Sequence, residues 1–189
     1  MNDPKTDTVW ALDQSDGELI LRTGVAGRAA RMGHRLTIEM TRWQATVNWA
    51  GGQPVSAELA VEVDSLAVVH GEGGVKGLSA AERALVRSNA LKSLSANRFP
   101  EIRFSADTIA NTVGGYRLIG TLQIGRKSRE HVIDLRTEGL DESWRMSAES
   151  RVRQSDYGIR PYSLLMGSMR VADEVTVSFT AVLRPSEMA

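Results

Sequence analysis

Long runs in which apolar and polar side chains alternate constrain the fold of this 189-residue chain more than any other feature. In the segment 171–184 the apolar residues occupy every second position near the end, and serines and threonines lie between them. The segment 143–153 repeats this pattern. Because successive side chains of a β-strand point to opposite faces, the alternation predicts strands with one dry and one wet face, as in antiparallel sheets.

Two of the remaining predicted strands change phase partway along their length. In 34–49 the apolar residues up to Met40 share one phase and those from Trp43 share the other. A strand changes face only at a bulge or bend, so we predict a break near Thr41–Arg42 and another near Asp64–Ser65 in the strand 55–69. The other predicted strands are 17–23, 100–109, 115–125 and 129–138. Long bent strands separated by glycine-containing turns favour an all-β antiparallel barrel or sandwich, in a single domain spanning residues 1–189.

One helix is predicted between these strands. Ser79 and Glu82 have the spacing of a capping box, and Asn97 and Pro100 predict that the helix ends by about residue 98. The expected apolar stripe is narrow, so the helix should dock on the sheet rather than form a core alone. This stripe consists of Ala81, Ala84, Leu85, Ser88 and Leu91. A second short helix or tight loop is expected within 161–169.

Composition and charge disfavour several classes of protein. The chain has 23 Lys and Arg against 23 Asp and Glu, so its net charge of 0 demands no basic face for nucleic acid. It has no cysteine, which excludes disulfides, thiolate nucleophiles and Cys-ligated metals. No apolar stretch is long enough for stable membrane insertion, and the polar start of the chain is unlike a signal peptide. We therefore expect a cytoplasmic protein.

Two short motifs suggest chemistry that their surroundings do not support. Residues 77–81 resemble a nucleophile elbow, but that turn belongs to a parallel α/β sheet, and Ser79 already fits a helix N-cap. The glycine-rich run 71–77 fails both phosphate-binding fingerprints, because Lys76 precedes Gly77 instead of following a glycine. We interpret this run as a mobile surface loop.

The histidines His34, His70 and His131 are the only candidate metal ligands, and their spacing matches no metal motif. The plain interpretation is a hydrogen-bonded imidazole, with a polar contact inside a pocket as the alternative. The carboxylates of Asp141 and Glu142 are interpreted as solvated turn residues. No catalytic residue and no metal site is predicted.

The largest side chains fall on the drier phase of their strands, and the sequence leaves open whether they fill a core or line a cavity. These residues are Trp43, Trp49, Phe104, Trp144, Met146 and Phe179. Barrels of about eight strands are wide enough either to be filled or to hold one ligand.

The segment Arg98–Ser105, read as Arg-Phe-Pro-Glu-Ile-Arg-Phe-Ser, resembles the "phe/tyr-pro-x-ile-x-phe-x-ser" signature of the YceI-like family. Residues 33–38 resemble an early strand of its actinobacterial-type members, and 119–124 resemble its "gly-x-leu-thr-ile" strand. Residues 155–159, followed by 171–177, resemble its closing segment. These motifs occur in the family's order and cover about residues 17–184.

The resemblance implies an extended, lipocalin-like antiparallel β-barrel of about eight strands, with one α-helix covering one end. Family members bind long apolar chains, such as polyisoprenoid quinones or lipids, inside the barrel, and many are periplasmic. This chain departs from the pattern at residues 125–131, Gly-Arg-Lys-Ser-Arg-Glu-His, where the family commonly has a less charged stretch. That departure concerns the identity of the ligand and the polarity of one rim.

We therefore predict non-catalytic binding of a long-chain hydrophobic ligand in the barrel interior, as a carrier or store. The ligand would be an isoprenoid quinone, a polyisoprenoid or a lipid, and no other cofactor is expected. His34, His131 and Tyr162 are the candidates for orienting a head group. The apolar candidates for ligand binding are Leu36, Ile38, Met40, Phe104, Leu118, Leu122, Trp144, Met146, Val177 and Phe179.

Two other functions stay open at this point. A histidine inside the barrel beside a serine or aspartate would favour a lipid- or acyl-processing enzyme. A solidly packed interior would favour a stress or interaction protein. A homodimer is also left open as a partner.

Overall fold

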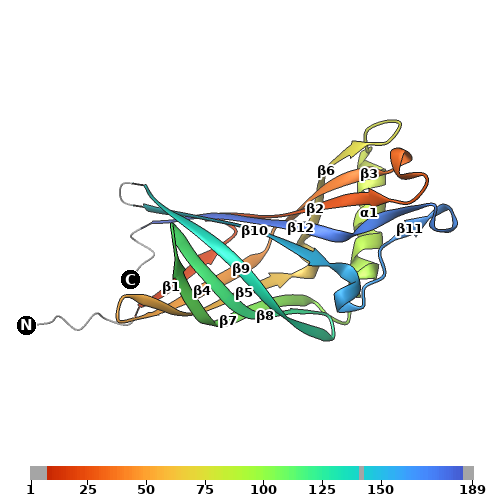
Figure 1. Ribbon diagram of the computed structural model, residues 1–189. Helices are drawn as coiled ribbons and strands as arrows, with labels where there is room; N and C mark the ends of the chain where they lie inside the picture. Colours follow the sequence, from red (N-terminus) through yellow and green to blue (C-terminus); the bar gives the residue numbers. More distant parts are fainter. Residues whose placement is uncertain (1–7, 141–142, 185–189) are drawn as a thin grey trace, which may run out of the picture.

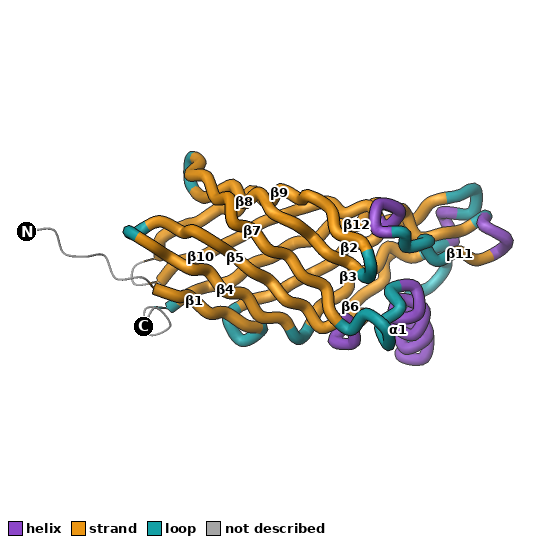
Figure 2. The backbone as a smooth tube through the Cα atoms, turned by 90° about the horizontal axis from the view of Figure 1, so that it is seen from below, coloured by secondary structure: helices purple, strands orange, loops and turns teal. Residues whose placement is uncertain are grey.

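The strands of the protein form one antiparallel sheet that curls round a long axis (Figure 2). The computed structural model describes residues 8–140 and 143–184. In the order in which they pair, the strands are β1 (Thr8–Asp13), β4 (Trp43–Ala50), β5 (Gln53–Glu62), β7 (Glu101–Thr112), β8 (Gly115–Ile124), β9 (Lys127–Leu140), β10 (Ser143–Arg153), β12 (Met169–Leu183), β2 (Gly17–Ala26), β3 (His34–Met40) and β6 (Leu66–Gly73), and the short β11 (Ser163–Leu164) pairs with β12.

The sheet curls round because the strands at the two ends of the pairing order, β1 and β6, continue along the chain into strands in its interior. The ladder begins at β1 and ends at β6, but β1 leads along the chain into β2 and β5 leads into β6. The closing contact is made by β12, which pairs with β2 from Ala181 opposite Gly17 to Arg170 opposite Ala26. The predicted antiparallel, barrel-like fold is confirmed.

The described residues form twelve strands, whereas about eight strands were predicted. Three long strands are each interrupted by a kink: between β1 and β2, between β3 and β4, and between β5 and β6. The first long strand was also predicted to begin at residue 17, so β1 was missed. The two kinks predicted from phase changes are present, at 41–42 and at the short 3-10 turn Val63–Ser65.

Polar side chains satisfy the backbone where β3–β4 and β5–β6 bend. The hydroxyl of the buried Ser65 donates to the carbonyl of Glu62 over 2.7 Å, and the hydroxyl of Thr41 donates to the carbonyl of Ser65 over 3.0 Å. On the outer side, Arg42 contacts the carboxylates of Glu62 and Asp64, each at 2.6 Å. These bonds replace the ladder bonds that each strand loses at its bend.

The helix α1 (Ala80–Ser93) lies across one end of the barrel (Figure 1). Its predicted capping box is present: the amide of Ser79 donates to the Glu82 carboxylate over 2.7 Å, and the amide of Glu82 donates to the Ser79 hydroxyl over 3.2 Å. The helix ends before residue 98, because Ser95 adopts a positive φ of 53° and the amide of Ala96 donates to the carbonyl of Leu91.

The predicted apolar stripe of α1 was correct at Leu91, which packs against the core, and wrong at Leu85. Leu85 is 62% exposed, and the helix presents Val86, Ala90 and Leu94 to the barrel instead. The guanidinium of Arg87 donates to the backbone carbonyls of Asp64 and Leu66, which anchors the helix at the β5–β6 bend.

The remaining helical segments are 3-10 turns: η1 (Ala30–Met32), η2 (Val63–Ser65), η3 (Gln154–Tyr157) and η4 (Leu165–Gly167). The turn η4 lies in the segment 161–169, where a short helix or tight loop was expected.

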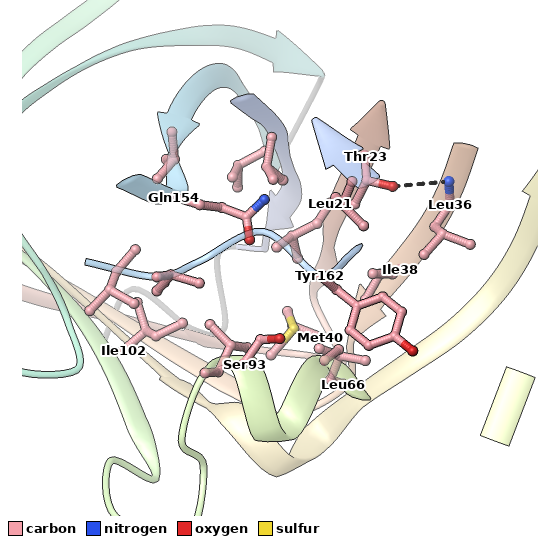
Figure 3. A pocket seen from close by; sticks show the side chains of 18 of the residues that line it. Leu21, Thr23, Leu36, Ile38, Met40, Leu66, Ser93, Ile102, Gln154 and Tyr162 are labelled. Carbon is pink, nitrogen blue, oxygen red and sulfur yellow. Dashed lines mark hydrogen bonds between the residues drawn. The ribbon is translucent and has the colours of Figure 1, made fainter. Parts of the chain in front are cut away.

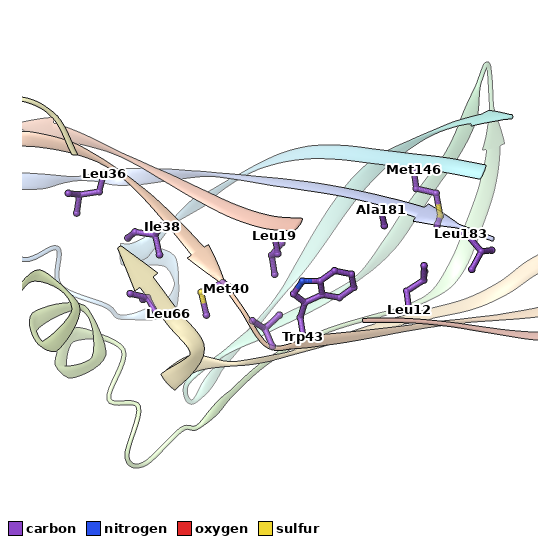
Figure 4. Packing of buried hydrophobic residues seen from close by; sticks show 11 residues of the cluster. Leu12, Leu19, Leu36, Ile38, Met40, Trp43, Leu66, Met146, Ala181 and Leu183 are labelled. Atoms are coloured by element: carbon purple, nitrogen blue, oxygen red, sulfur yellow. The ribbon is translucent and has the colours of Figure 1, made fainter. Parts of the chain in front are cut away.

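Trp43 divides the interior of the barrel into two halves (Figure 4). Its side chain is only 2% exposed and contacts the ring of Phe179 edge-on, with 5.3 Å between ring centroids. On the side away from α1, which we call the filled half, the buried residues are Leu12, Met146, Ala181 and Leu183. The side toward α1, which we call the hollow half, contains a cavity.

Candidate ligand-binding site

The hollow half encloses a cavity of about 340 Å³ with an almost entirely apolar wall. Side chains of Leu21 on β2, Ile38 on β3 and Ile102 on β7 turn toward this space, and Ser93 of α1 lies beneath them (Figure 3). Ligand pockets of small molecules typically range from about 300 to 1,000 Å³, so the cavity is large enough for one narrow apolar ligand.

Polar side chains on the cavity wall are largely engaged with the protein itself. The hydroxyl of Thr23 accepts from the amide of Leu36 over 3.2 Å, and the amide of Gln154 donates to the carbonyl of Ala172 over 2.9 Å. His34 donates through Nε2 to the carbonyl of Lys76 over 2.7 Å. These bonds lower the polarity that the wall offers to a ligand, since the groups already have partners.

The glycine-rich loop approaches His34 so closely that only glycine fits at one position. Gly74 has a φ of +69°, and a Cβ at this residue would lie 2.6 Å from the imidazole of His34. The bond from His34 to Lys76 holds this loop against a residue of the cavity wall. Tyr162 lies at the same end of the cavity and is 37% exposed.

His131 is a partly buried titratable group on the cavity wall. Its Nε2 lies 2.6 Å from the hydroxyl of Ser150, and its ring meets Phe104 edge-on at 6.4 Å. Burial lowers the pKa of the imidazole below its usual value, because the charged form loses hydration. Burial therefore favours the neutral form of the imidazole.

Most residues predicted to bind the ligand lie around this one cavity. Those on its wall are Leu36, Ile38, Met40, Phe104, Leu122, Val177, His34, His131 and Tyr162. Leu118, Met146 and Phe179 do not line it: all three point inward, but they pack in the cores of the barrel instead.

Trp144 was predicted to point into the barrel and is instead 43% exposed. It shares the phase of Met146, but it is the second residue of β10, at the rim where the strand begins. The alternation placed Trp144 on the same side of β10 as Met146, but it did not indicate that the barrel wall ends close to Trp144.

The helix supplies lining residues that the sequence analysis missed. They are Val86, Asn89, Ala90, Ser93 and Leu94. Two of these five are polar, so the face of α1 that meets the cavity does not stand out as an apolar stripe. A signal was present only in the spacing of Val86, Ala90 and Leu94 at every fourth position.

Two absences apply to the described residues, 8–140 and 143–184. They contain no cluster of three or more His, Asp or Glu side chains suited to a metal ion. None of their helices has the length and apolar character needed to cross a membrane. The pair Asp141–Glu142, interpreted above as a turn, lies outside the described residues.

The chain belongs to the YceI-like family: the model of the YceI-like domain matches residues 10–183. This match extends the resemblance found in the sequence to include the missed strand β1.

Solved structures show the same fold at low sequence identity. BcnA of Burkholderia cenocepacia superposes with a TM-score of 0.69 at 15% identity, covering 90% of this chain and 98% of BcnA. The YceI protein of Campylobacter jejuni superposes with a TM-score of 0.59 at 11% identity, covering 78% of this chain and 83% of its own. A search of curated proteins finds no match.

Proposed function

We propose that the protein binds a long-chain hydrophobic ligand, such as an isoprenoid quinone, a polyisoprenoid or another lipid, in its hollow half and does no chemistry on it. The observation that supports this most directly is the apolar cavity of about 340 Å³, which α1 helps to line. Membership of the YceI-like family supports the same class of ligand.

Burial of the chain would provide the binding energy. Each methylene group moved out of water contributes about 0.8 kcal/mol before the ordering of the ligand is subtracted. Such a ligand needs a continuous dry channel rather than a set of polar contacts, which matches a wall built from leucine, isoleucine and valine.

The test is to fill the cavity and measure uptake of a neutral fluorescent probe, N-phenyl-1-naphthylamine. A Leu36→Trp, Val177→Trp double variant places two large side chains on the cavity wall and should reduce uptake at least tenfold. Met146→Trp adds similar bulk in the filled half and serves as the matched control, which should bind like the parent. Equal binding by the double variant, still folded, would contradict the proposal. Mass spectrometry of an organic extract would then identify the natural ligand.

One observation favours an acyl-processing enzyme as a second candidate. The bond of 2.6 Å between His131 and Ser150 on the cavity wall is the arrangement that would favour such an enzyme. Against it, no carboxylate among the described residues bonds to the imidazole, so nothing of that kind orients the base.

This candidate is tested by assaying long and short acyl esters with the parent, Ser150→Ala, and a His34→Ala, His131→Ala double variant. We expect no turnover above background in any of them. Turnover by the parent that both variants lose would replace the binding proposal with an enzymatic one.

A further inference from the structure

The wall of the barrel has a seam between β9 and β10 in the hollow half. The β9–β10 ladder pairs Ser143–Ser147 with Arg136–Leu140 and then stops, although β9 extends back to Lys127 and β10 extends on to Arg153. Along the rest of their length, β9 keeps its pairing with β8 and β10 keeps its pairing with β12. The two strands diverge toward the helix end (Figure 1).

Side chains close this seam where backbone bonds do not. The bond between His131 on β9 and Ser150 on β10 crosses it, and the guanidinium of Arg129 donates to the carbonyl of Asp156 in η3 over 3.3 Å. Side-chain bonds of this kind open more readily than a continuous ladder of backbone bonds, because each can break independently of its neighbours.

A second, polar cavity of about 250 Å³ lies over the seam, and we call it the vestibule. His131 and Val152 line both the vestibule and the apolar cavity, so single side chains separate the two. A ligand with its tail in the hollow half would therefore have its head group within reach of the vestibule if it lay across the seam.

The wall of the vestibule carries more guanidinium groups than carboxylates, although Arg153 also lies near the carboxylate of Asp173. Arg129, Arg151 and Arg153 line it, against the carboxylates of Glu130 and Asp156. Guanidinium groups present several fixed N–H donors that match the oxygens of phosphate and carboxylate. Arg151 also contacts Glu174 at 3.6 Å, but both side chains are largely exposed, and such surface pairs rearrange at little expense.

We propose that the vestibule holds the anionic head group of the ligand, so that the natural ligand is a long-chain phosphate or carboxylate rather than a neutral lipid. The tail lies in the hollow half and the head group passes the seam beside His131. This inference rests on the proposed function, since it names the class of ligand that the same cavity accepts.

The test compares three probes that share a twelve-carbon chain: dodecyl phosphate, dodecanoate and dodecanol. Each competes with N-phenyl-1-naphthylamine for the parent protein. We expect the two anions to bind roughly tenfold more tightly than the alcohol, which is the size expected of one hydrogen bond between charged groups. The anion that binds more tightly identifies the head group as phosphate or carboxylate.

The Arg151→Gln, Arg153→Gln double variant should lose this preference and keep its affinity for dodecanol. An Arg117→Gln, Arg145→Gln double variant removes the same charge from exposed ion pairs away from the vestibule, and it should behave like the parent. Equal binding of all three probes by the parent, or an equal loss in both variants, would overturn the head-group site. Failure of every probe, including the neutral reporter, would instead overturn the proposed function.

Discussion

The filled half and the hollow half of this barrel are built from the same alternating strands, yet the apolar cavity lies in the hollow half. In the filled half the inward positions carry the largest side chains: the rings of Trp10 and Trp49 lie 4.3 Å apart, and Trp49 meets Tyr116 at 6.1 Å. In the hollow half the same inward phase carries mainly leucine, isoleucine and valine, with Phe104 and Met40 among them. The volume of the inward side chains, rather than the alternation along the strands, therefore decides where this barrel stays open.

Trp43 marks the boundary, and its removal should have the largest effect. Trp43→Ala deletes an almost fully buried indole between the halves, so we expect the free energy of unfolding to fall by about 3–5 kcal/mol. Urea unfolding measures this directly. The matched control is Trp144→Ala, because the same residue type at the exposed rim should alter stability by about 1 kcal/mol or less. Similar losses of stability in both variants would show that the packing of Trp43 between the two halves stabilises the fold no more than an exposed tryptophan does.

Enlarging one side chain in each half gives the second test. Met146→Trp overfills a packed region and should lower the free energy of unfolding by about 1–3 kcal/mol. Val177→Phe adds volume at the cavity wall, where space is available, and should change stability by less than about 1 kcal/mol. The two urea midpoints provide the comparison. A larger loss from Val177→Phe would mean that the hollow half is packed as tightly as the filled half.

The same distinction explains what the sequence could and could not predict. Alternation assigns a side chain to the inner or outer face, so the strands and the bends after Met40 and Glu62 were predictable. It carries no information about position along the barrel axis, which is why Met146 and Phe179 were expected on the wall of the ligand site and pack in the core instead. This position follows from the register of neighbouring strands, which depends on pairings that are distant in sequence.

The parts of the site that were missed come from contacts between elements. The cavity face of α1 was hidden because Asn89 and Ser93 interrupt its apolar side. The bond between His131 and Ser150 depends on where β9 and β10 part, which no local pattern reports. The charged stretch 125–131 left the polarity of one rim open, and Arg129 and His131 from this stretch line the vestibule.

Local stability should differ between the two halves because α1 covers only the hollow one. No residue of α1 is fully buried, and the helix is held to the bend partly by Arg87. We expect hydrogen exchange in 71–97 to be faster than in 171–184 and to slow when N-phenyl-1-naphthylamine is bound. Equal protection in both segments, with or without the probe, would show that α1 is held as firmly as β12 and does not respond to binding.

Arg87→Ala should make the exchange of 80–93 faster still, because the variant loses the bonds to the carbonyls of Asp64 and Leu66. Arg103→Ala is the control: this side chain contacts only Glu101 on the outside of the sheet among the ion pairs described. Exchange of α1 should be unchanged in the control. If both substitutions made the exchange of 80–93 equally faster, the cause would be the loss of a positive charge rather than the loss of the bonds that anchor α1.

The smallest expected effect concerns pH at the start of α1. The amide and hydroxyl of Ser79 hold the pKa of Glu82 at about 2, below its ordinary value of 4.5, and Lys76 adds to this shift. The folded form therefore favours the ionised carboxylate, so the contribution of Glu82 to stability is complete above pH 4.5 and is lost as the pH falls toward 2. Thermal unfolding of Glu82→Gln should differ from the parent at pH 7, and this difference should shrink across that window. Glu58→Gln, which removes an exposed carboxylate from β5, is the matched control for the loss of one charge. A constant difference for Glu82→Gln would mean that the capping box adds nothing to the attachment of the helix over the hollow half.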